Sequence, residues 1–367
     1  MARRQGAVRY AVVGLGHIAQ VAVLPAFKHA TRNSRLVAVV SGDRAKRRDA
    51  AGRYGVETYD YDDYDRCLET VDAVYVAVPN HLHAEYTVRA AGAGVHVLCE
   101  KPLAVTVAEC RRMIAACRRH RVKLMTAYRL HFEEINLRAI DLVRDGRIGE
   151  PKFFNSSFSM RVRQGNVRTK RELGGGTLYD IGVYCINAAR YLFREEPTSV
   201  TATSVNSGVA ALKGIDESTA AVLRFGDDRL ASFVTSFNAS GVGEYRVVGT
   251  EGDLHVDPAY EYQQGLAYVL TVGDKTERKR VAKRDQFAAE LLHFSDCIRN
   301  DRVPEPSGEE GLQDVRIVEA LYRSARTGRA VSIPPFTDAK RPTGRQKVVR
   351  PGIRKPRLVK VKSASGD

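Results

Sequence analysis

The sequence has no tryptophan, no cysteine pair at metal-ligand spacing, no internal repeat and no long apolar run. The six cysteines are scattered, and no Cys-x-x-Cys motif or Cys/His cluster occurs, so a bound metal is not predicted. No apolar stretch approaches the roughly 20 residues of a membrane-spanning helix, and no signal peptide precedes the first predicted strand. These absences indicate a cytoplasmic protein with reduced thiols and no membrane partner.

The net charge of +15 is concentrated at one end of the chain. Residues 340–362 contain ten Lys/Arg and no acid, and three prolines interrupt them. We therefore expect residues 338–367 to form a basic, disordered or extended tail. A role in binding nucleic acid or another polyanion is the less favoured interpretation, because no aromatic residues lie between the charges to stack on bases.

The length of 367 residues allows two domains, and the first half has the pattern of an α/β domain. Short apolar strands alternate with amphipathic helices, which predicts a parallel sheet covered on both faces. Strands are expected at 8–13, 36–41, 73–77, 95–99 and 122–126, and helices at 17–30, 43–54, 81–93 and 105–120. We assign residues 1–127 to a doubly wound Rossmann domain.

The pattern changes after Gly149-Glu150-Pro151. Alternation with period two predicts strands at 152–162, 198–205, 218–225, 230–237, 245–249 and 267–272. Helices are expected at 177–193, 285–299 and 308–327, and the last begins with a capping box formed by Ser307 and Glu310. Residues 128–337 are thus expected to form an α+β domain with a large, mostly antiparallel open sheet.

A glycine-rich turn follows the first predicted strand, with the pattern Gly14-x-Gly16-x-x-Ala19. Gly14 allows the tight turn, and Gly16 lets the backbone approach a pyrophosphate. The next helix would begin near His17 and Ile18 and present free N–H groups to the anion. With a strand before it and a helix after it, this turn predicts a dinucleotide site.

Three further motifs carry a family resemblance: Glu100-Lys101-Pro102, residues 78–83, and residues 174–184. Together with the glycine-rich turn they resemble the family of glucose–fructose oxidoreductase and inositol dehydrogenase over roughly residues 8–336, and most closely the glucose–fructose oxidoreductase branch. The resemblance implies an NAD(P)-dependent oxidoreductase that acts on the CH–OH group of a sugar, a polyol or a related cyclic compound.

Two departures from that branch change the expectations. Its periplasmic members carry a leader and an N-terminal arm that retains the cofactor, whereas this chain has neither, so we expect a cofactor that exchanges. Val167 stands where the branch has a tryptophan, so the substrate wall there must differ.

The end of the second predicted strand decides the cofactor. NAD enzymes place an acid there, and NADP enzymes replace it with neutral and cationic groups. Alignment puts Ser41 at the acidic position, with Arg44 and Lys46 close enough to neutralise a 2′-phosphate. This favours NADP, although Asp43 would serve NAD if the register were shifted by two residues.

The loop after the third core strand lies where ligands bind in doubly wound sheets. The resemblance implies that Pro79 and Asn80 line the cofactor there, with His83 and Glu100 nearby.

The expected catalytic residues are Lys101, Asp180 and Tyr184. Lys101 and Tyr184 would transfer the substrate proton, and Asp180 would orient both of them. Because Asp180, Tyr184 and Asn187 follow one another at i, i+4 and i+7, one helix face would present them. Asn187 is assigned to substrate binding together with two basic residues, Arg168 and Arg171; weaker candidates are Arg129, Tyr260 and Tyr262.

Two other functions remain open from the sequence. One is a non-catalytic regulator of the same fold that binds NADP as a signal, and the other is a dihydrodiol or diketone oxidoreductase. In either case the open sheet of the second domain is expected to form the interface of a homodimer or homotetramer.

Overall fold

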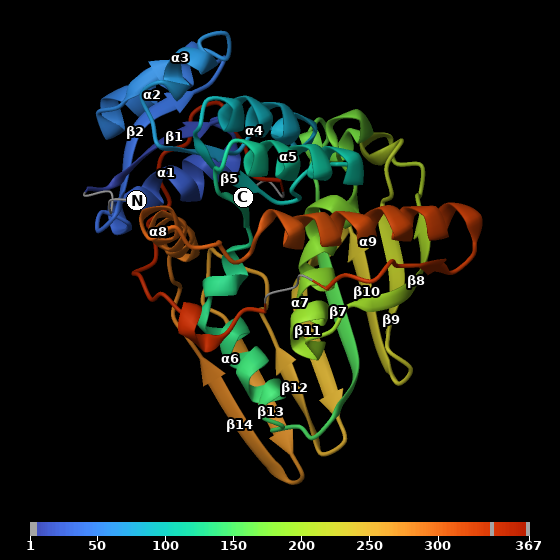
Figure 1. Ribbon diagram of the computed structural model, residues 1–367. Coiled ribbons are helices and arrows are strands. Elements are labelled where there is room, and N and C mark those ends of the chain that lie inside the picture. Colours follow the sequence, from blue (N-terminus) through green and yellow to red (C-terminus); the bar gives the residue numbers. More distant parts are fainter. Residues whose placement is uncertain (1–5, 338–340, 365–367) are drawn as a thin grey trace.

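The computed structural model describes residues 6–337 and 341–364, which form two domains with one long helix lying across both (Figure 1). The first domain has a six-stranded parallel sheet in the order β3-β2-β1-β4-β5-β6. Its strands are β1 (Val8–Val13), β2 (Ser34–Val40), β3 (Glu57–Tyr59), β4 (Ala73–Val76), β5 (His96–Glu100) and β6 (Leu124–Ala127). The strand order reverses between β1 and β4, and this switch point opens a crevice at the carboxyl ends of the strands. The expected Rossmann sheet is confirmed.

The helices of this domain are α2 (Arg44–Tyr54), α3 (Tyr64–Leu68), α4 (His83–Gly92) and α5 (Val107–Arg119). A full capping box starts α5, where Thr106 and Glu109 bond each other's backbone N–H groups. The helix expected at 17–30 is irregular instead: it consists of a π-helical turn, Ala19–Val23, a short α1 (Leu24–Ala26) and a 3₁₀ turn, Phe27–His29. Pro25 lies within it and lacks the N–H that a regular helix uses.

The second domain has a nine-stranded sheet in the order β14-β13-β12-β11-β7-β10-β9-β8-β15. Its strands are β7 (Pro151–Arg161), β8 (Pro197–Val205), β9 (Ser218–Phe225), β10 (Arg229–Ser236), β11 (Asn238–Gly249), β12 (Gly252–Val256), β13 (Ala267–Val272), β14 (Lys275–Arg280) and β15 (Val331–Ser332). All neighbours are antiparallel except β7 and β10. The sequence did not predict β12, β14 and β15; β14 is exposed along its whole length and therefore lacks alternation.

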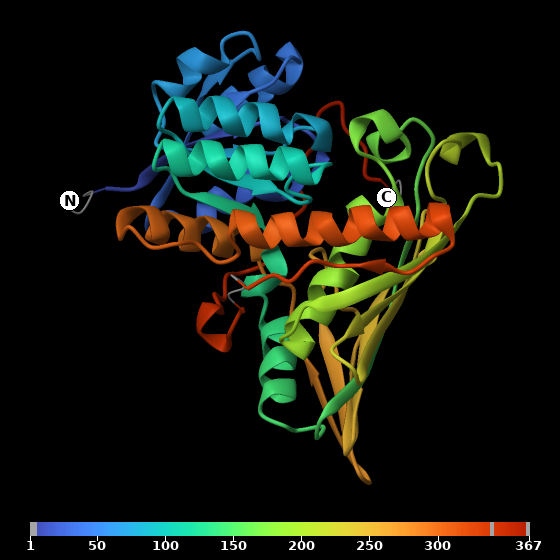
Figure 2. The ribbon, with the colours of Figure 1, turned by 45° about the vertical axis from the view of Figure 1, so that its right-hand side comes forward.

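Helices cover only one face of this sheet. They are α6 (Glu134–Arg144), α7 (Val183–Phe193) and α9 (Gly308–Thr327), and all three lie on the same side in Figure 2. Within the described ranges, the opposite face carries no α-helix (Figure 2). The expected open, mostly antiparallel sheet is therefore confirmed.

Helix α8 (Gln286–Arg299) comes late in the chain but belongs to the core of the first domain. It packs Phe287, Leu291 and Phe294 into the core around β1 and β2, so residues 128–337 do not serve the second sheet alone. At the start of α9, the Glu310 N–H donates to Ser307 Oγ, but the Glu310 carboxylate pairs with Arg190 at 2.8 Å. The expected capping box is thus only half formed, because the buried guanidinium attracts the carboxylate more strongly than a backbone N–H does.

The described part of the basic tail, residues 341–364, is extended apart from one turn, Gly344–Gln346. It is packed on the molecule: Val348, Ile353 and Leu358 are partly buried against the first-domain core. Among the described residues, the search for a helix long and apolar enough to cross a membrane finds none.

Candidate active site

A cleft of about 1630 Å³ opens between the two domains at the carboxyl ends of the first sheet. Its walls include the loops that follow β1 and β4, the start of α4, the turn before α7 and the loop after β12. Twelve residues assigned from the sequence line it: Gly16, His17, Ile18, Lys46, Pro79, Asn80, His83, Glu100, Lys101, Arg168, Asp180 and Tyr184. The weaker candidates Arg129, Tyr260 and Tyr262 line it too. Gly14, Ser41, Arg44, Arg171 and Asn187 do not belong to its lining.

The glycine-rich turn after β1 has the geometry that a dinucleotide requires. Gly14 has φ +95°, and a Cβ there would lie 2.6 Å from the Ala77 carbonyl oxygen, so only glycine fits between the two strand ends. An ideal Cβ on Gly16 meets no atom closer than 4.0 Å, and Gly16 lines the cleft with its backbone uncovered. A pyrophosphate fits this open backbone beside the first helical turn.

The residues that follow β2 are those predicted to select the cofactor. β2 ends at Val40, and Ser41 follows it as a buried residue whose Oγ accepts the Asp43 N–H at 3.3 Å. The Asp43 carboxylate caps α2 by accepting the Ala45 N–H at 2.8 Å and the Lys46 N–H at 3.2 Å. Asp43 is thus engaged as a helix cap, whereas the Lys46 side chain lines the cleft. Arg44 is exposed outside it.

The loop after β4 is fixed to both domains. Asn80 Nδ2 donates to the Gly174 carbonyl oxygen at 3.0 Å. His83 is fully buried, with Nδ1 2.9 Å from the Pro102 carbonyl oxygen and Nε2 3.0 Å from that of Val78. Burial lowers the pKa of His83, and the neutral ring donates to one of these carbonyls. His83 therefore links the loop after β4 to the segment that carries Lys101.

Asp180 joins two cations from different segments. Lys101 Nζ donates to the Asp180 carbonyl oxygen at 2.6 Å and lies 3.3 Å from Oδ1, while Arg168 Nε donates to Oδ2 at 2.6 Å. Burial alone would raise the pKa of Asp180, but the Arg168 guanidinium and the Lys101 ammonium outweigh it and lower that pKa. Because an ammonium has three donors, Lys101 retains one for a substrate oxygen.

Tyr184, in the first turn of α7, lies next to the Lys101 side chain. Lys101 Nζ is 4.8 Å from the centroid of the Tyr184 ring, and Arg129 Nη2 donates to the Tyr184 hydroxyl at 3.2 Å. The Arg129 side chain is buried and also donates to Gln286 Oε1 and to the Tyr260 carbonyl oxygen. Since the Tyr184 oxygen accepts from Arg129, its own O–H can still donate, and Tyr184 lines the cleft.

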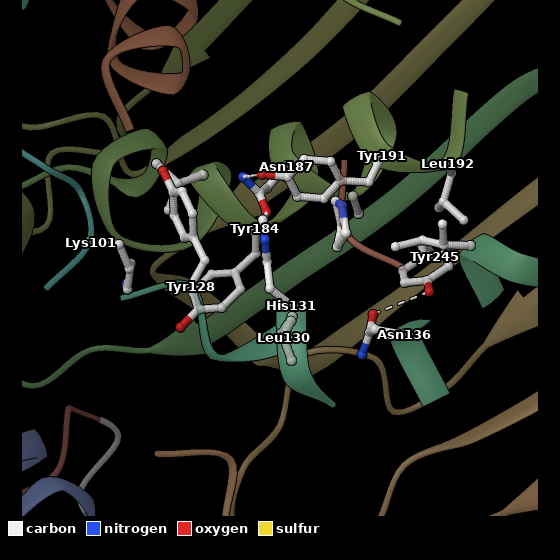
Figure 3. A pocket seen from close by; sticks show the side chains of 14 residues that line it. Lys101, Tyr128, Leu130, His131, Asn136, Tyr184, Asn187, Tyr191, Leu192 and Tyr245 are labelled. Atoms are coloured by element: carbon white, nitrogen blue, oxygen red, sulfur yellow. Dashed lines mark hydrogen bonds between the residues drawn. The ribbon is translucent and has the colours of Figure 1, made fainter. Parts of the chain in front are cut away.

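A small chamber of about 30 Å³ is lined in part by Tyr184. Figure 3 shows the side chains around it. Lys101, Tyr128 and Tyr184 lie at one end, and at the other Tyr245 donates to Asn136 at 3.2 Å (Figure 3). A space of this size holds about one water molecule. The chamber is therefore too small for a substrate, which must enter from the larger cleft.

Asn187 lines this inner chamber. Its Nδ2 donates to Asp314 at 2.7 Å, and its Oδ1 lies 3.1 Å from His131 Nε2. Asn187 follows Tyr184 by three residues on the regular helix α7, but its amide is buried and hydrogen-bonded within the protein. The structure thus brings Asp180 and Tyr184 to the cleft but not Asn187.

The two arginines assigned to substrate binding separate in the same way. Arg168 pairs with Asp180 in the cleft, whereas Arg171 is exposed. Arg129, a weaker candidate from the sequence, has a buried side chain in the cleft wall. Its place directly after β6 and Tyr128, at the carboxyl edge of the sheet, is the signal that points to it. Three tail lysines that line the cleft, Lys355, Lys360 and Lys362, had no sequence signal at all.

Taken together, the cleft combines a dinucleotide turn with a lysine, a tyrosine and a carboxylate at the carboxyl ends of the strands. This arrangement defines a nicotinamide-dependent oxidoreductase, in which the protein binds and orients while the cofactor carries the electrons.

The comparisons with known proteins agree with this class. Residues 8–128 match the model of an oxidoreductase family with an NAD-binding Rossmann fold, and residues 140–333 match that family's C-terminal alpha/beta domain. The chain belongs to the Gfo/Idh/MocA oxidoreductase family.

Individual relatives are similar along nearly their whole length. The chain is 33% identical over 338 residues to a D-xylose 1-dehydrogenase [NADP(+)] of Haloarcula marismortui, covering 89% of this chain and 93% of that protein. A crystal structure of aldose-aldose oxidoreductase from Caulobacter crescentus with glycerol superposes with a TM-score of 0.85 at 39% identity, covering 89% of this chain and 100% of that one. A 3-ketoreductase from Actinomadura kijaniata, in complex with NADP and TDP-benzene, superposes with a TM-score of 0.80 at 27% identity and covers 87% and 98%.

Proposed function

We propose that this protein is an NADP-dependent oxidoreductase that interconverts an alcohol and a carbonyl group on a sugar, a polyol or a related cyclic compound. The observation that carries the proposal is the meeting of Lys101, Asp180 and Tyr184 in the interdomain cleft. The named relatives, which act on xylose and on other sugar derivatives, support this substrate class.

The contacts of each side chain indicate its role in the reaction. Bound nicotinamide supplies or accepts the hydride. Lys101 donates its remaining N–H to the reacting oxygen, and the Tyr184 hydroxyl exchanges the proton with that oxygen. Asp180 holds the Lys101 ammonium in place, while Arg168 balances the second carboxylate oxygen. Pairing two cations with one buried carboxylate leaves net positive charge, which stabilises an oxyanion as it forms.

NADP is the proposed cofactor because nothing acidic is available at the ribose end. Ser41 holds the position of the usual acid, Asp43 is engaged at the α2 N-terminus, and Lys46 faces the cleft. Titration of the native protein and of Ser41→Asp with NADPH and NADH tests this choice. Tighter NADPH binding that the substitution removes would support it, and a preference of the native protein for NADH would reject it.

The activity is tested by assaying a panel of aldoses, polyols and keto sugars with NADP and NADPH, with Lys101→Ala as the inactive control. Turnover that disappears in Lys101→Ala would support the proposal. If the native protein binds NADP but turns over no compound in either direction, the enzyme assignment fails and the role of a cofactor-sensing regulator takes its place.

We further propose a homodimer that forms through the uncovered face of the nine-stranded sheet. Leu230 and Val234 on β10 and Phe153 on β7 are large apolar residues on that face, with 51%, 49% and 43% of their surfaces exposed. Apolar side chains so placed along neighbouring strands are typical of a protein interface. A cytoplasmic location is proposed from the six buried, reduced cysteines.

A further inference from the structure

The C-terminal segment reaches the cofactor cleft. We call residues 350–364 the strap; in Figures 1 and 2 its red ribbon passes the first domain and ends between the two domains. Six of its residues line the cleft: Lys355, Lys360, Val361, Lys362, Ser363 and Ala364. The family models end at residue 333, so the strap is an addition to the two family domains.

The strap is hydrogen-bonded to the dinucleotide turn through Gln20. Gln20 Nε2 donates to the Leu15 carbonyl oxygen at 2.9 Å and to that of Val359 at 3.0 Å. In return, the Val359 N–H donates to Gln20 Oε1 at 2.8 Å. Leu15 stands between the two glycines of the turn, so one buried amide connects the strap to the backbone that faces the pyrophosphate.

Further contacts attach the strap to both walls of the cleft. Lys360 Nζ lies 3.2 Å from Asp43 Oδ2 at the start of α2, on the first domain. On the second domain, the Arg163 N–H donates to the Ala364 carbonyl oxygen at 3.0 Å. The strap therefore crosses the mouth of the cleft, and bound cofactor at this end would lie beneath it.

The earlier part of the strap is held firmly enough to support this crossing. The Asp285 N–H donates to the Arg350 carbonyl oxygen at 3.1 Å, and Lys283 Nζ donates to that of Ile353 at 2.7 Å. Ile353 and Leu358 pack against the first-domain core. These contacts offset part of the entropy that ordering an extended, basic segment costs.

The positive charges on the strap are complementary to the negative charges of a phosphorylated dinucleotide. Lys46 and Lys360 both line the cleft. Asp43 pairs with the Lys360 ammonium at 3.2 Å, whereas it meets Lys46 through the backbone N–H, so the Lys46 ammonium has no such ion pair. Burial and the Lys360 ammonium lower the pKa of Lys46 against the opposing effect of Asp43. A dianionic group between the two lysines would remove this repulsion. Nearer the dinucleotide turn, burial and the cations Arg168 and Lys355 lower the pKa of His17.

We propose that the strap is part of the cofactor site: Lys360, together with Lys46, binds the 2′-phosphate of NADP, and the strap closes the adenosine end of the cleft. The proposal rests on the proposed NADP-dependent function. It assigns cofactor selectivity partly to a segment outside the family domains.

The test is a binding experiment on the full-length protein. Calorimetric titration with NADP and NAD gives the Kd values, and the fluorescence of released NADPH in a stopped-flow competition gives the dissociation rate. The variants are Lys360→Ala, Lys46→Ala and the double substitution. Lys347→Ala is the matched control, since Lys347 is an exposed tail lysine that does not line the cleft.

For Lys360→Ala we expect the Kd for NADP to rise about fivefold to tenfold, because one charge-assisted contact to the phosphate is lost. NADPH should also dissociate faster. The Kd for NAD should change less than about twofold, and Lys347→Ala should resemble the native protein. In the double variant the effects of Lys46→Ala and Lys360→Ala should be non-additive, because both side chains serve one phosphate.

The assignment of Lys360 would be overturned if Lys360→Ala and Lys347→Ala changed the Kd for NADP equally. It would also be overturned if Lys360→Ala weakened the binding of NADP and of NAD by the same factor. If the native protein binds NADP tightly and the strap variants do not differ from it, only the strap proposal fails. If the native protein binds neither dinucleotide, the proposed function fails with it.

Discussion

The Arg129 guanidinium donates a hydrogen bond to the Tyr184 hydroxyl oxygen, with an Nη2–O distance of 3.2 Å. Arg129 comes from the end of the first sheet and Tyr184 from α7, so this contact joins the two domains at the reacting end of the cleft. The Arg129 side chain also lies 5.0 Å from the Tyr184 ring centroid. Arg129 thus fixes both the position of the ring and the direction in which the hydroxyl can donate.

Arg129→Met should lower kcat about 10- to 100-fold, since the Tyr184 hydroxyl would lose its fixed orientation while the chain keeps Lys101. The Kd for NADP should stay within about twofold of the native value. In a Tyr184→Phe background the same substitution should have little further effect on kcat, because Arg129 acts through the hydroxyl. Arg171→Met, at an exposed arginine, is the control and should leave kcat unchanged.

Lys101→Met should lower kcat about 10²- to 10⁴-fold, as expected when a positioned proton donor is removed. Steady-state kinetics measure kcat, and a separate titration measures the affinity for NADP. We expect NADP binding to persist, because the dinucleotide turn and Lys46 are untouched. A variant with near-native kcat would show that Lys101 does not act on the substrate oxygen.

Local sequence patterns predicted most strands of both sheets and the dinucleotide turn, because strand alternation and the turn at Gly14 depend on neighbouring residues. The other cleft residues, among them Lys101 and Tyr184, were indicated by the family resemblance. The partners of the site residues were harder to predict. Asn187 follows the spacing of Asp180 and Tyr184, but it is buried, bonded to Asp314 and absent from the cleft lining. The contact between Gln20 and Val359 joins residues 339 positions apart, and no local periodicity encodes such a pairing.

The burial of Glu290 is another feature that the sequence did not reveal. Glu290 on α8 is fully buried, and neither carboxyl oxygen has a hydrogen-bond partner among the residues that the structure describes. Its position in an amphipathic helix did not set it apart from the surface acids of the sequence. Burial, followed by the nearby Glu100 carboxylate, raises the pKa of Glu290 well above the ordinary range.

Glu290→Gln should therefore stabilise the protein more at pH 8 than at pH 5. The folded state keeps the Glu290 proton at pH values where the unfolded chain has released it, so stability falls by up to about 1.4 kcal/mol per pH unit above the unfolded pKa. Glutamine removes this dependence. Urea unfolding at both pH values measures the difference, and Glu69→Gln, at an exposed acid of the first domain, is the control. An equal change in unfolding free energy at pH 5 and pH 8 would contradict the prediction.

The uncovered sheet face gives the last prediction. Leu230→Glu combined with Val234→Glu places two charges on the same face of β10, on either side of Ser232, where the proposed dimer would bury them. Burying an unpaired carboxylate costs several kcal/mol, which exceeds what most interfaces of ordinary size can absorb. The variant should sediment as a monomer with its NADP affinity retained, since the cleft lies on the other side of the sheet. Val303→Glu, at an equally exposed apolar residue beyond α8, should sediment like the native protein. If the double variant remains dimeric, the two copies associate through another surface.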